Sequence, residues 1–476
     1  MKINPVIFRA YDIRGIYLDD FNEDFAFKIG QALVKFLRQK KSKIKRKTRL
    51  KIVVGQDNRL SSPTLFKSLS KGITNAGADI IDIGLSTTPM FYFAVAFYRF
   101  DGGIVITSSH NPPEYNGFKL VREKAIPISG KTGLKRIRTL CATRTLISPK
   151  LRTLCATRTL AEKTTVKKKG RIIKKKVLQD YVKFNLREFY INKLYPFKIV
   201  VDTANSVSGI IIPSIFKKSP LKIYHLFQEL DGSFPNHNPD PLKKENLKSL
   251  RKEVLKRKSD LGIAFDGDGD RIVFITERGE IVPGDIVTAL IVNIILKGSS
   301  GKKVIYDVRS SNIVRETIEK NKGLPLENRI GHSFIKERMR KENVFFAGEF
   351  SGHYYSRKHY FCECPFLILF SILKEMSETK KTLSQLIKPF KKYYHSGEIN
   401  FKVKDKKKIL KILEKKFGKK GKILKIDGLK INFPNWWFNF RPSNTEPVLR
   451  LVAEAKTKKI LEKKKKELIS LIKKRS

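Results

Sequence analysis

A serine and a histidine stand side by side in the stretch GGIVITSSHNPPEYNGFKL, residues 102–120. The apolar run GGIVI predicts a buried strand, and polar residues begin where that strand should end. A hydroxyl beside an imidazole is a candidate nucleophile with a proton acceptor nearby, here His110. Two prolines would hold the loop in one conformation, and Lys119 could steady an anion or shuttle a proton. The residues alone do not distinguish Ser108 from Ser109 as the nucleophile.

Three aspartates alternate with glycines directly after a second apolar run, in LGIAFDGDGDRIVF. Asp266, Asp268 and Asp270 can converge on one cation because the glycines let the backbone curl. Oxygen ligands select a hard ion such as Mg²⁺ or Ca²⁺. A calcium EF-hand is the alternative, with Glu277 at its last ligand position, but Arg271 stands where that loop requires glycine and a strand-like run follows. The pattern therefore predicts a divalent-metal site with a cation beside it, as a phosphate ligand would need.

Two further polar turns carry groups suited to a sugar phosphate. In GEFSGHYYS, three side chains alternate around a glycine and can face one way as hydrogen-bond partners for sugar hydroxyls; they are Glu349, Ser351 and His353. Upstream, GHSFIK supplies His332. In FNFRPSNTEPVLRL, a guanidinium, a hydroxyl-rich turn and successive backbone N–H groups suit an anion. The side chains concerned are Arg441, Ser443, Asn444 and Thr445.

Three segments of the chain repeat one pattern. The runs KIVV, KIVV and KVIY, which begin at Lys51, Lys198 and Lys303, are short and apolar, and each ends in a polar turn. A helix-like stretch follows each run, and a second strand-like piece follows in the first two cases. This order predicts three similar α/β domains with mixed or largely parallel sheets. Such sheets bind ligands at the carboxyl ends of their strands, where the polar turns lie.

The remainder of the chain, after about Tyr394, has a different pattern. INFKVK, ILKIDGLKINF and WWFNF are strand-like, while KKILKILEKKF and KKILEKKKKELISLIKK are typical of amphipathic helices. We expect a smaller C-terminal α+β domain here. The expected domains span residues 1–175, 176–280, 281–393 and 394–476.

A duplicated segment interrupts the first domain. The nonapeptide RTLCATRTL occurs twice between residues 138 and 160, and removing residues 141–160 leaves a continuous helix-like GLKRIRTLAEK. We interpret residues 138–160 as an insertion that forms a surface loop, which a fold tolerates well. Cys141 and Cys155 would then have no part in the chemistry.

Composition limits the class of protein. At 476 residues the chain is long enough for about three domains, no apolar run reaches the roughly 18 residues of a membrane-spanning helix, and the first residues lack a signal-peptide pattern. Four cysteines make no disulfide framework, so we expect a cytoplasmic protein. The net charge of +54 would suit a nucleic-acid partner, but no nucleic-acid motif accompanies it. We expect the charge to attract anionic substrates generally.

With these motifs in order, the chain resembles the α-D-phosphohexomutase family, in its phosphomannomutase/phosphoglucomutase branch. The resemblance runs from FRAYDIRG, at residues 8–15, to RPSNTEP, at residues 441–447, with about one motif in each expected domain. It implies that Ser109 is a phosphoserine and that Asp266, Asp268 and Asp270 bind one Mg²⁺ together with that phosphate. It places Arg14, His110, Lys119 and Arg271 in the catalytic centre. It also implies that the three α/β domains and the smaller α+β domain surround a central cleft.

The resemblance also implies how substrate is held. Arg309 and His332 match positions near the substrate, Glu349, Ser351 and His353 match the sugar-recognition loop, and a final loop grips the phosphate that does not react. That loop contains Arg441, Ser443, Asn444 and Thr445.

The implied activity is interconversion of hexose 1-phosphate and 6-phosphate, of mannose or glucose, with a hexose 1,6-bisphosphate as intermediate and activator. The implied partner is the phosphosugar alone, bound by a monomer or dimer, with no specific nucleic acid and no membrane. Phe350 stands where this branch commonly has methionine and where glucosamine-specific relatives tend to have glutamine. A phosphoglucosamine mutase and a non-catalytic nucleic-acid-binding protein are the alternatives.

Overall fold

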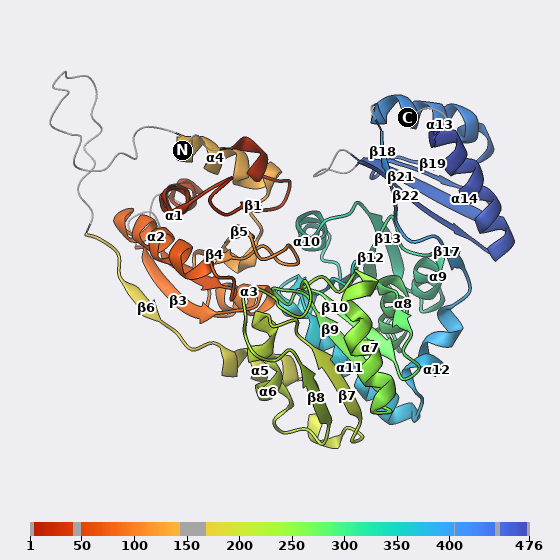
Figure 1. The fold of residues 1–476 in the computed structure, drawn as a ribbon, viewed down its shortest axis with the longest axis horizontal. Helices are drawn as coiled ribbons and strands as arrows, with labels where there is room; N and C mark the ends of the chain where they lie inside the picture. The colour runs from red at the N-terminus through yellow and green to blue at the C-terminus, as the bar shows by residue number, and fades with distance from the viewer. Residues whose placement is uncertain (1–3, 41–48, 143–167, 404, 443–447, 474–476) are drawn as a thin grey trace.

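The structure is a computed structural model that describes residues 4–40, 49–142, 168–403, 405–442 and 448–473. Within these ranges the strands form four sheets, which follow one another along the chain from red to blue in Figure 1. Three sheets carry helices in an α/β arrangement, and the fourth belongs to an α+β unit at the C-terminal end. The predicted fold class is confirmed.

The first sheet has six strands in the order β1-β5-β4-β2-β3-β6. Helices α1 and α2 cover one face and α3 covers the other, because alternate residues of β2 face opposite ways: Ile52 and Val54 pack with α1 and α2, and Val53 packs with α3. The elements are β1 (Ile13–Ile16), α1 (Glu23–Lys40), β2 (Lys51–Gln56), α2 (Ser62–Asn75), β3 (Asp79–Leu85), α3 (Thr88–Phe97), β4 (Gly102–Ile106), β5 (Tyr115–Arg122), α4 (Lys135–Ala142) and β6 (Ile172–Lys174).

The second sheet has five strands in the order β11-β10-β9-β7-β8. Its elements are α5 (Leu178–Leu186), β7 (Lys198–Asp202), α6 (Ile212–Phe216), β8 (Lys222–Leu226), α7 (Lys248–Lys256), β9 (Leu261–Phe265), β10 (Ile272–Thr276) and β11 (Ile281–Val282).

The third sheet has five strands in the order β13-β12-β14-β15-β16. Its elements are α8 (Gly284–Ile295), β12 (Lys303–Asp307), α9 (Asn312–Lys320), β13 (Leu324–Asn328), α10 (His332–Lys341), β14 (Phe346–Gly348), β15 (Tyr354–Ser356), β16 (Cys362–Glu363), α11 (Pro365–Thr379) and α12 (Leu383–Ile387).

The three repeated runs of the sequence occupy equivalent places. They form β2, β7 and β12, and each of these strands lies between two parallel neighbours while antiparallel strands extend the sheet on one side. The polar turns that follow the three strands therefore sit at corresponding carboxyl ends. The repeat seen in the sequence is a repeat of structure.

The C-terminal unit is antiparallel throughout its described strands. β22 pairs with β17, β18 and β21, and β20 joins β21 to β19. Figure 1 draws this unit in blue, with α13 and α14 together beside its sheet. The elements are β17 (Tyr394–His395), β18 (Ile399–Lys402), α13 (Lys406–Phe417), β19 (Lys422–Leu424), β20 (Leu429–Asn432), β21 (Trp436–Pro442), β22 (Val448–Ala455) and α14 (Lys458–Lys473).

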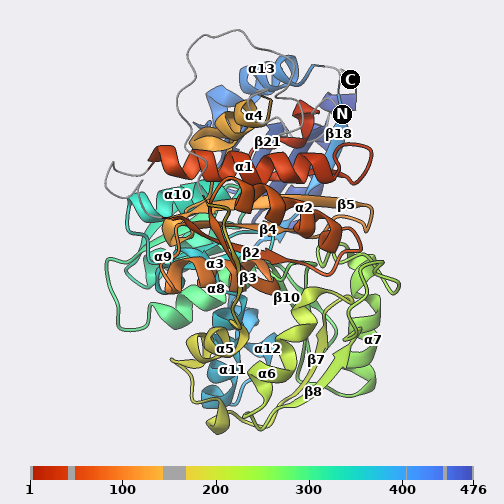
Figure 2. The same cartoon turned by 90° about the vertical axis from the view of Figure 1, so that its left-hand side faces the viewer.

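The two strongly apolar helices α3 and α8 are largely buried. α3 and most of α8 lie in one hydrophobic core, to which the first three sheets all contribute. None of the described helices is long and apolar enough to cross a membrane. Figure 2 shows the first sheet and its helices stacked above the second.

The interpretation of residues 138–160 as a surface loop is wrong for its first residues. Residues 138–142 belong to α4, where Leu140 and Cys141 are 4 % and 3 % exposed in the core that α1 also lines. They are buried because they fall on the apolar face of that helix. The second copy of the repeat, with Cys155, lies outside the described residues.

Candidate active site

The serine loop begins where β4 ends, and its backbone is held in an uncommon conformation. Ser109 has a φ of +52°, in the left-handed region that side chains other than glycine rarely adopt. Its N–H donates to the hydroxyl of Thr107 at 3.0 Å. The Ser109 hydroxyl is 2.8 Å from Asp266 Oδ2, whereas the buried Ser108 hydroxyl has no hydrogen-bond partner among the described residues. This geometry favours Ser109 as the reacting serine.

A buried arginine from the turn after β2 fixes this loop. The Arg59 guanidinium, 0 % exposed, pairs with Asp57 at 3.2 Å. It donates to the carbonyl oxygens of Ser109 at 2.8 Å and Asn111 at 2.6 Å, and also to those of Pro112 and Tyr115. Arg59 therefore donates to four carbonyl oxygens of the serine loop and so fixes the path of its backbone. In the sequence, Arg59 is marked only by its place in the polar turn that follows the first KIVV run.

The aspartate loop follows β9 and folds around its own first carboxylate. Asp266 Oδ1 accepts hydrogen bonds from the N–H groups of Asp270 and Arg271, both at 3.1 Å. Gly267 approaches the serine loop so closely that a Cβ there would lie 2.3 Å from the Ser109 carbonyl oxygen. Glycine is thus required at this position if the two loops are to meet.

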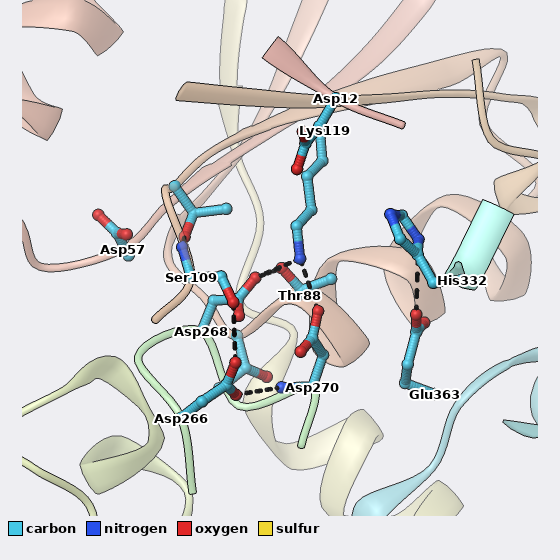
Figure 3. A network of polar contacts seen from close by, with 12 residues as sticks. Asp12, Asp57, Thr88, Ser109, Lys119, Asp266, Asp268, Asp270, His332 and Glu363 are labelled. Carbon is cyan, nitrogen blue, oxygen red and sulfur yellow. Dashed lines mark hydrogen bonds and ion pairs between the residues drawn. The ribbon is translucent and has the colours of Figure 1, made fainter. Parts of the chain in front are cut away.

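The carboxylates of Asp266, Asp268 and Asp270 converge. Each offers an oxygen within 4.8 Å of the others, and all three residues are buried. Lys119 Nζ lies between two of them, 2.6 Å from Asp268 Oδ2 and 2.6 Å from Asp270 Oδ2 (Figure 3). The other oxygen of Asp268, Oδ1, is buried and accepts nothing from the described residues. An orphaned carboxylate oxygen within a cluster of oxygen donors fits a hard divalent cation such as Mg²⁺.

The EF-hand alternative does not match this geometry. The residues after the aspartates form β10 rather than a helix. Glu277 turns away to accept hydrogen bonds from the backbone and hydroxyl of Ser384. It is not part of the carboxylate cluster.

Charge in the cluster is divided unequally. Burial, together with Asp270 and Asp268, raises the pKa of Asp266 well above its ordinary value. Burial acts in the same direction on Asp270, but Lys119 and His353 outweigh it and hold the pKa of Asp270 well below the ordinary value. The Lys119 pKa is raised, because the attraction of Asp268 and Asp270 exceeds the cost of burial. Lys119 is therefore held in its cationic form, and its ammonium offsets the negative charge of Asp268 and Asp270.

His110, unlike Lys119, is favoured in its neutral form. Its Nδ1 is 3.2 Å from the Ser109 hydroxyl, and burial, followed by the charges of Arg271 and Arg14, lowers its pKa well below the ordinary value. A neutral imidazole beside a hydroxyl can accept a proton. Arg14 reaches the same loop by donating to Asn111 Oδ1 at 2.8 Å, while Asp12 holds its other side at 2.7 Å.

The sugar-loop residues meet the metal loop through His353. His353 Nε2 is 3.1 Å from Asp270 Oδ1 and 3.2 Å from Arg271 Nε. On the other side of the ring, Nδ1 is 2.9 Å from the Ser351 hydroxyl and 3.4 Å from Glu349 Oε2. The predicted trio of Glu349, Ser351 and His353 is thus a contiguous cluster that reaches the aspartates.

His332 lies at the start of α10, beside the same region. Its ring is 5.4 Å from that of Tyr11, between centroids, and its Nδ1 is 3.8 Å from Glu363 Oε1. Tyr11 in turn donates to the carbonyl oxygen of Ile330 at 3.0 Å. The first and third units therefore meet at His332.

A second group of cations joins the third unit to the fourth. Arg309 is anchored by Asp307 at 2.9 Å, and Glu398 lies 3.8 Å from Arg309 and 3.3 Å from Arg441. Asp427 lies 3.9 Å from Arg441. The two guanidiniums share the Glu398 carboxylate and therefore lie close enough together to bind one anion. The other predicted members, Ser443, Asn444 and Thr445, lie outside the described residues.

Several contributors had no recognisable signal in the sequence. The Thr88 hydroxyl donates to Asp268 Oδ2 at 2.5 Å from the start of α3. Others are charged side chains in unremarkable stretches, distant in sequence from their partners. These are Asp57, Arg59, Glu363, Glu398 and Asp427. Lys336 is the second basic group of the GHSFIK stretch that contains His332.

Comparison with known proteins supports one family over the whole chain. Residues 5–146, 178–279 and 283–393 match the phosphoglucomutase/phosphomannomutase alpha/beta/alpha domains I, II and III. Residues 398–471 match the C-terminal domain of the same proteins.

Full-length relatives agree. The chain is 39% identical over 467 residues to the phosphomannomutase of Methanocaldococcus jannaschii, covering 98% of this chain and 97% of that protein. It is 36% identical over 465 residues to the phosphomannomutase of Escherichia coli K12, covering 94% of each. A crystal structure of a phosphoglucomutase/phosphomannomutase family protein from Burkholderia thailandensis superposes with a TM-score of 0.86 at 29% identity, over 99% of this chain and 98% of that one.

The resemblance read from the motifs is thereby confirmed, together with the class of enzyme that it implies. The chain belongs to the phosphoglucomutase/phosphomannomutase family of phosphotransferring isomerases.

Proposed function

We propose that this chain interconverts the 1-phosphate and 6-phosphate of mannose, glucose or both, through a phosphorylated Ser109 and a hexose 1,6-bisphosphate. The observation that carries the proposal is the contact between the Ser109 hydroxyl and Asp266, at 2.8 Å. This contact joins two loops 157 residues apart and puts the nucleophile against the carboxylate cluster. The family assignment supplies the reaction class.

In the proposed cycle, the phosphoryl group of Ser109 passes to the free hydroxyl of a hexose monophosphate. The P–O bond to the serine breaks, a P–O bond to the sugar forms, and the hydroxyl proton leaves the sugar. The bisphosphate then reverses its orientation, and its other phosphate returns to Ser109. Each half-reaction conserves one phosphoryl group, so no external donor is consumed.

The carboxylates of Asp266, Asp268 and Asp270, together with a phosphate on Ser109, would hold one Mg²⁺. Bound there, the ion offsets negative charge on the transferring phosphoryl group. Arg271 and Lys119 add fixed positive charge around the same position.

Proton movement is assigned to His110 on the grounds of its charge state. As a neutral imidazole 3.2 Å from the Ser109 hydroxyl, it can take the proton from the attacking hydroxyl and deliver it to the oxygen that leaves phosphorus. That oxygen is the serine oxygen when the phosphoryl group passes to the sugar, and the sugar oxygen when the phosphoryl group returns to Ser109. Lys119, held as a cation by two aspartates, is suited to stabilising charge.

The phosphate that does not react would lie against Arg309 and Arg441, with Ser443, Asn444 and Thr445 completing the loop. Glu349, Ser351 and His353 would bind the sugar hydroxyls. Phe350 stacks on His395, with ring centroids 5.0 Å apart, so an apolar ring stands where glucosamine-specific relatives tend to have an amide. This favours mannose or glucose over glucosamine as substrate.

The test compares wild type with Ser109→Ala and, as a matched control, Ser108→Ala. With Mg²⁺ and a trace of hexose 1,6-bisphosphate, we expect wild type and Ser108→Ala to convert mannose or glucose 1-phosphate to the 6-phosphate and Ser109→Ala to lose this activity. Intact-mass analysis should find one phosphate on the first two proteins only. Full turnover by Ser109→Ala would overturn the assignment.

Two further measurements separate the alternatives. The ratio of kcat/KM on mannose, glucose and glucosamine phosphates decides between the sugars. Salt-sensitive binding to DNA or RNA in a protein without mutase turnover would instead favour the nucleic-acid-binding alternative.

A further inference from the structure

Two fully buried charges near the site have no part in the proposed cycle. Lys336, from α10, places its ammonium 2.9 Å and 3.0 Å from the two carboxylate oxygens of Glu363 in β16. Both side chains are 0 % exposed. The ammonium also lies 4.1 Å from the centroid of the Tyr92 ring in α3, which adds a cation–π contact.

A buried ion pair of this kind contributes little to the free energy of folding. Removing two charges from water costs about as much as their attraction returns, and apolar residues of the same volume often serve as well or better. A buried ion pair that is present in spite of this cost calls for a neighbour on which it acts.

That neighbour is His332. His332 and Lys336 are four residues apart on α10, so they lie on the same side of the helix. His332 Nδ1 faces Glu363 Oε1 at 3.8 Å (Figure 3) and has no hydrogen-bond partner within the described part of the chain. The Glu363 carboxylate therefore contacts both the ammonium and the imidazole.

We propose that Lys336 and Glu363 are positioning residues that keep His332 as a neutral imidazole protonated at Nδ1, with its Nε2 lone pair available to a sugar hydroxyl. The Glu363 carboxylate makes the Nδ1 side of the ring electronegative and so favours the proton there. The Lys336 ammonium balances that carboxylate, so that it does not draw a second proton onto the ring. The statement that the hydroxyl belongs to a sugar rests on the proposed function. The assignment of the tautomer does not.

The surroundings of His332 support the neutral form. Burial, then the charges of Lys336 and Lys119, lower the pKa of His332 well below its ordinary value. The ionisable groups that bear on the ring come from six segments of the chain. They are Tyr11, Lys119, Asp270, Lys336, His353 and Glu363.

The experiment records ¹⁵N–¹H spectra of the histidine rings in the full-length protein between pH 6 and pH 8. His332 is identified by the loss of its signals in His332→Gln. The variants are Glu363→Gln, Lys336→Met and the double variant, which replaces the ion pair by two neutral side chains of similar size. Lys297→Met is the control, because it breaks a lysine–glutamate pair of the same length, 2.9 Å, with Glu375 in the same domain, where the Lys297 side chain is 57 % exposed and no histidine is involved in the pair.

We expect wild type and Lys297→Met to show neutral His332 with the proton on Nδ1. Glu363→Gln should move the proton to Nε2, and the double variant should do the same. Lys336→Met should show imidazolium, because it leaves the carboxylate without its counter-charge. An unchanged tautomer in both Glu363→Gln and the double variant overturns the proposal. The double variant keeps the test decisive if Lys336→Met fails to fold.

Kinetics give an independent reading. If the Nε2 lone pair accepts a hydrogen bond from the sugar, Glu363→Gln should raise KM for the hexose phosphate about tenfold, the value of one such hydrogen bond, with a smaller change in kcat. If Glu363→Gln shifts the tautomer but the wild-type protein has no mutase turnover, the role of the Lys336–Glu363 pair stands and the proposed function is refuted. If wild type has normal mutase turnover but the variants show no tautomer shift, the proposed function stands and the role of the pair is refuted.

Discussion

Arg59 donates a hydrogen bond of 2.8 Å from Nη2 to the carbonyl oxygen of Ser109. The two residues come from the ends of neighbouring strands, β2 and β4, so the parallel pairing of these strands brings the guanidinium beneath the serine loop. With φ at +52°, the Ser109 backbone is in a conformation that its surroundings must stabilise. The arginine supplies that stabilisation through a whole run of loop carbonyls.

Replacing Arg59 by methionine should damage both folding and turnover. The carbonyls of Ser109 and Asn111 would lose the Arg59 donor, and the buried Asp57 carboxylate would lose its counter-charge. We expect this to cost about 3 kcal/mol in the free energy of unfolding. We expect kcat to fall at least tenfold, because the hydroxyl of Ser109 would lose its fixed direction. Urea unfolding and steady-state kinetics measure the two effects.

Arg49→Met is the matched control for this change. Arg49 pairs with Asp79 at 3.2 Å near the end of the same sheet that is remote from the site, but its side chain is 34 % exposed. Its loss should cost less than about 1 kcal/mol and leave kcat unchanged. Equal kinetic damage in the two variants would show that Arg59 has no special relation to the serine.

Lys119→Met should make the folded protein depend on divalent metal. Without the ammonium, three buried carboxylates face one another with one less counter-charge, and we expect a loss of about 3–5 kcal/mol in the presence of EDTA. Mg²⁺ should restore much of it, since an ion that binds only the folded state stabilises that state.

The measurement is the Tm of wild type and variant with EDTA and with excess Mg²⁺. The rise caused by Mg²⁺ should be larger in Lys119→Met than in wild type or in Lys358→Met, which breaks a surface pair with Glu188. An equal rise in all three proteins would contradict the view that Lys119 and the metal neutralise the same carboxylates.

His359 should make the protein less stable in mild acid. Burial, then the charges of Arg187 and Lys358, lower its pKa to about 3 in the folded state, while the unfolded chain has the ordinary value of about 6.5. Between these values the unfolded state binds more protons, so stability falls as pH falls from about 6.5 towards 3. At pH 5 the loss from this group is about 2 kcal/mol.

The comparison is urea unfolding of wild type and His359→Phe at pH 7 and pH 5. The variant should lose about 2 kcal/mol less than wild type over this interval. His237→Asn is a control of opposite sign, because Asp202 raises the folded pKa of His237 against the effect of burial and that group stabilises the folded state below its unfolded pKa. A pH dependence of His359→Phe that matches wild type would rule out His359 as the source.

Much of the fold could be predicted from local pattern. The repeated KIVV-type runs form equivalent central strands because a strand buried on both faces must be apolar and short, whatever surrounds it. The α+β character of the C-terminal unit also followed from alternation and amphipathic periodicity, but the antiparallel pairing of its strands did not. The α4 residues in the duplicated segment did not, because repetition in a sequence says nothing of which copy lies on a helix face.

The motifs of the site were equally visible, because the chemistry is concentrated in contiguous turns. Ser109 with His110, the alternating aspartates and the GEFSGH loop each place several functional groups within a few residues. The three motifs lie close together in the structure, as their proposed roles require.

The sequence by itself determined which functional groups this protein has and which secondary structures carry them, because both depend on neighbours along the chain. Only the tertiary structure decided which serine faces the aspartates, that Arg59 fixes the serine backbone, and that Lys336 and Glu363 stand behind His332. Those relationships are set by strand order and helix packing, which bring residues tens to hundreds of positions apart within a few ångströms. Burial then shifts the pKa of each charged group by an amount that depends on its surroundings in the folded protein and not on its neighbours in the sequence.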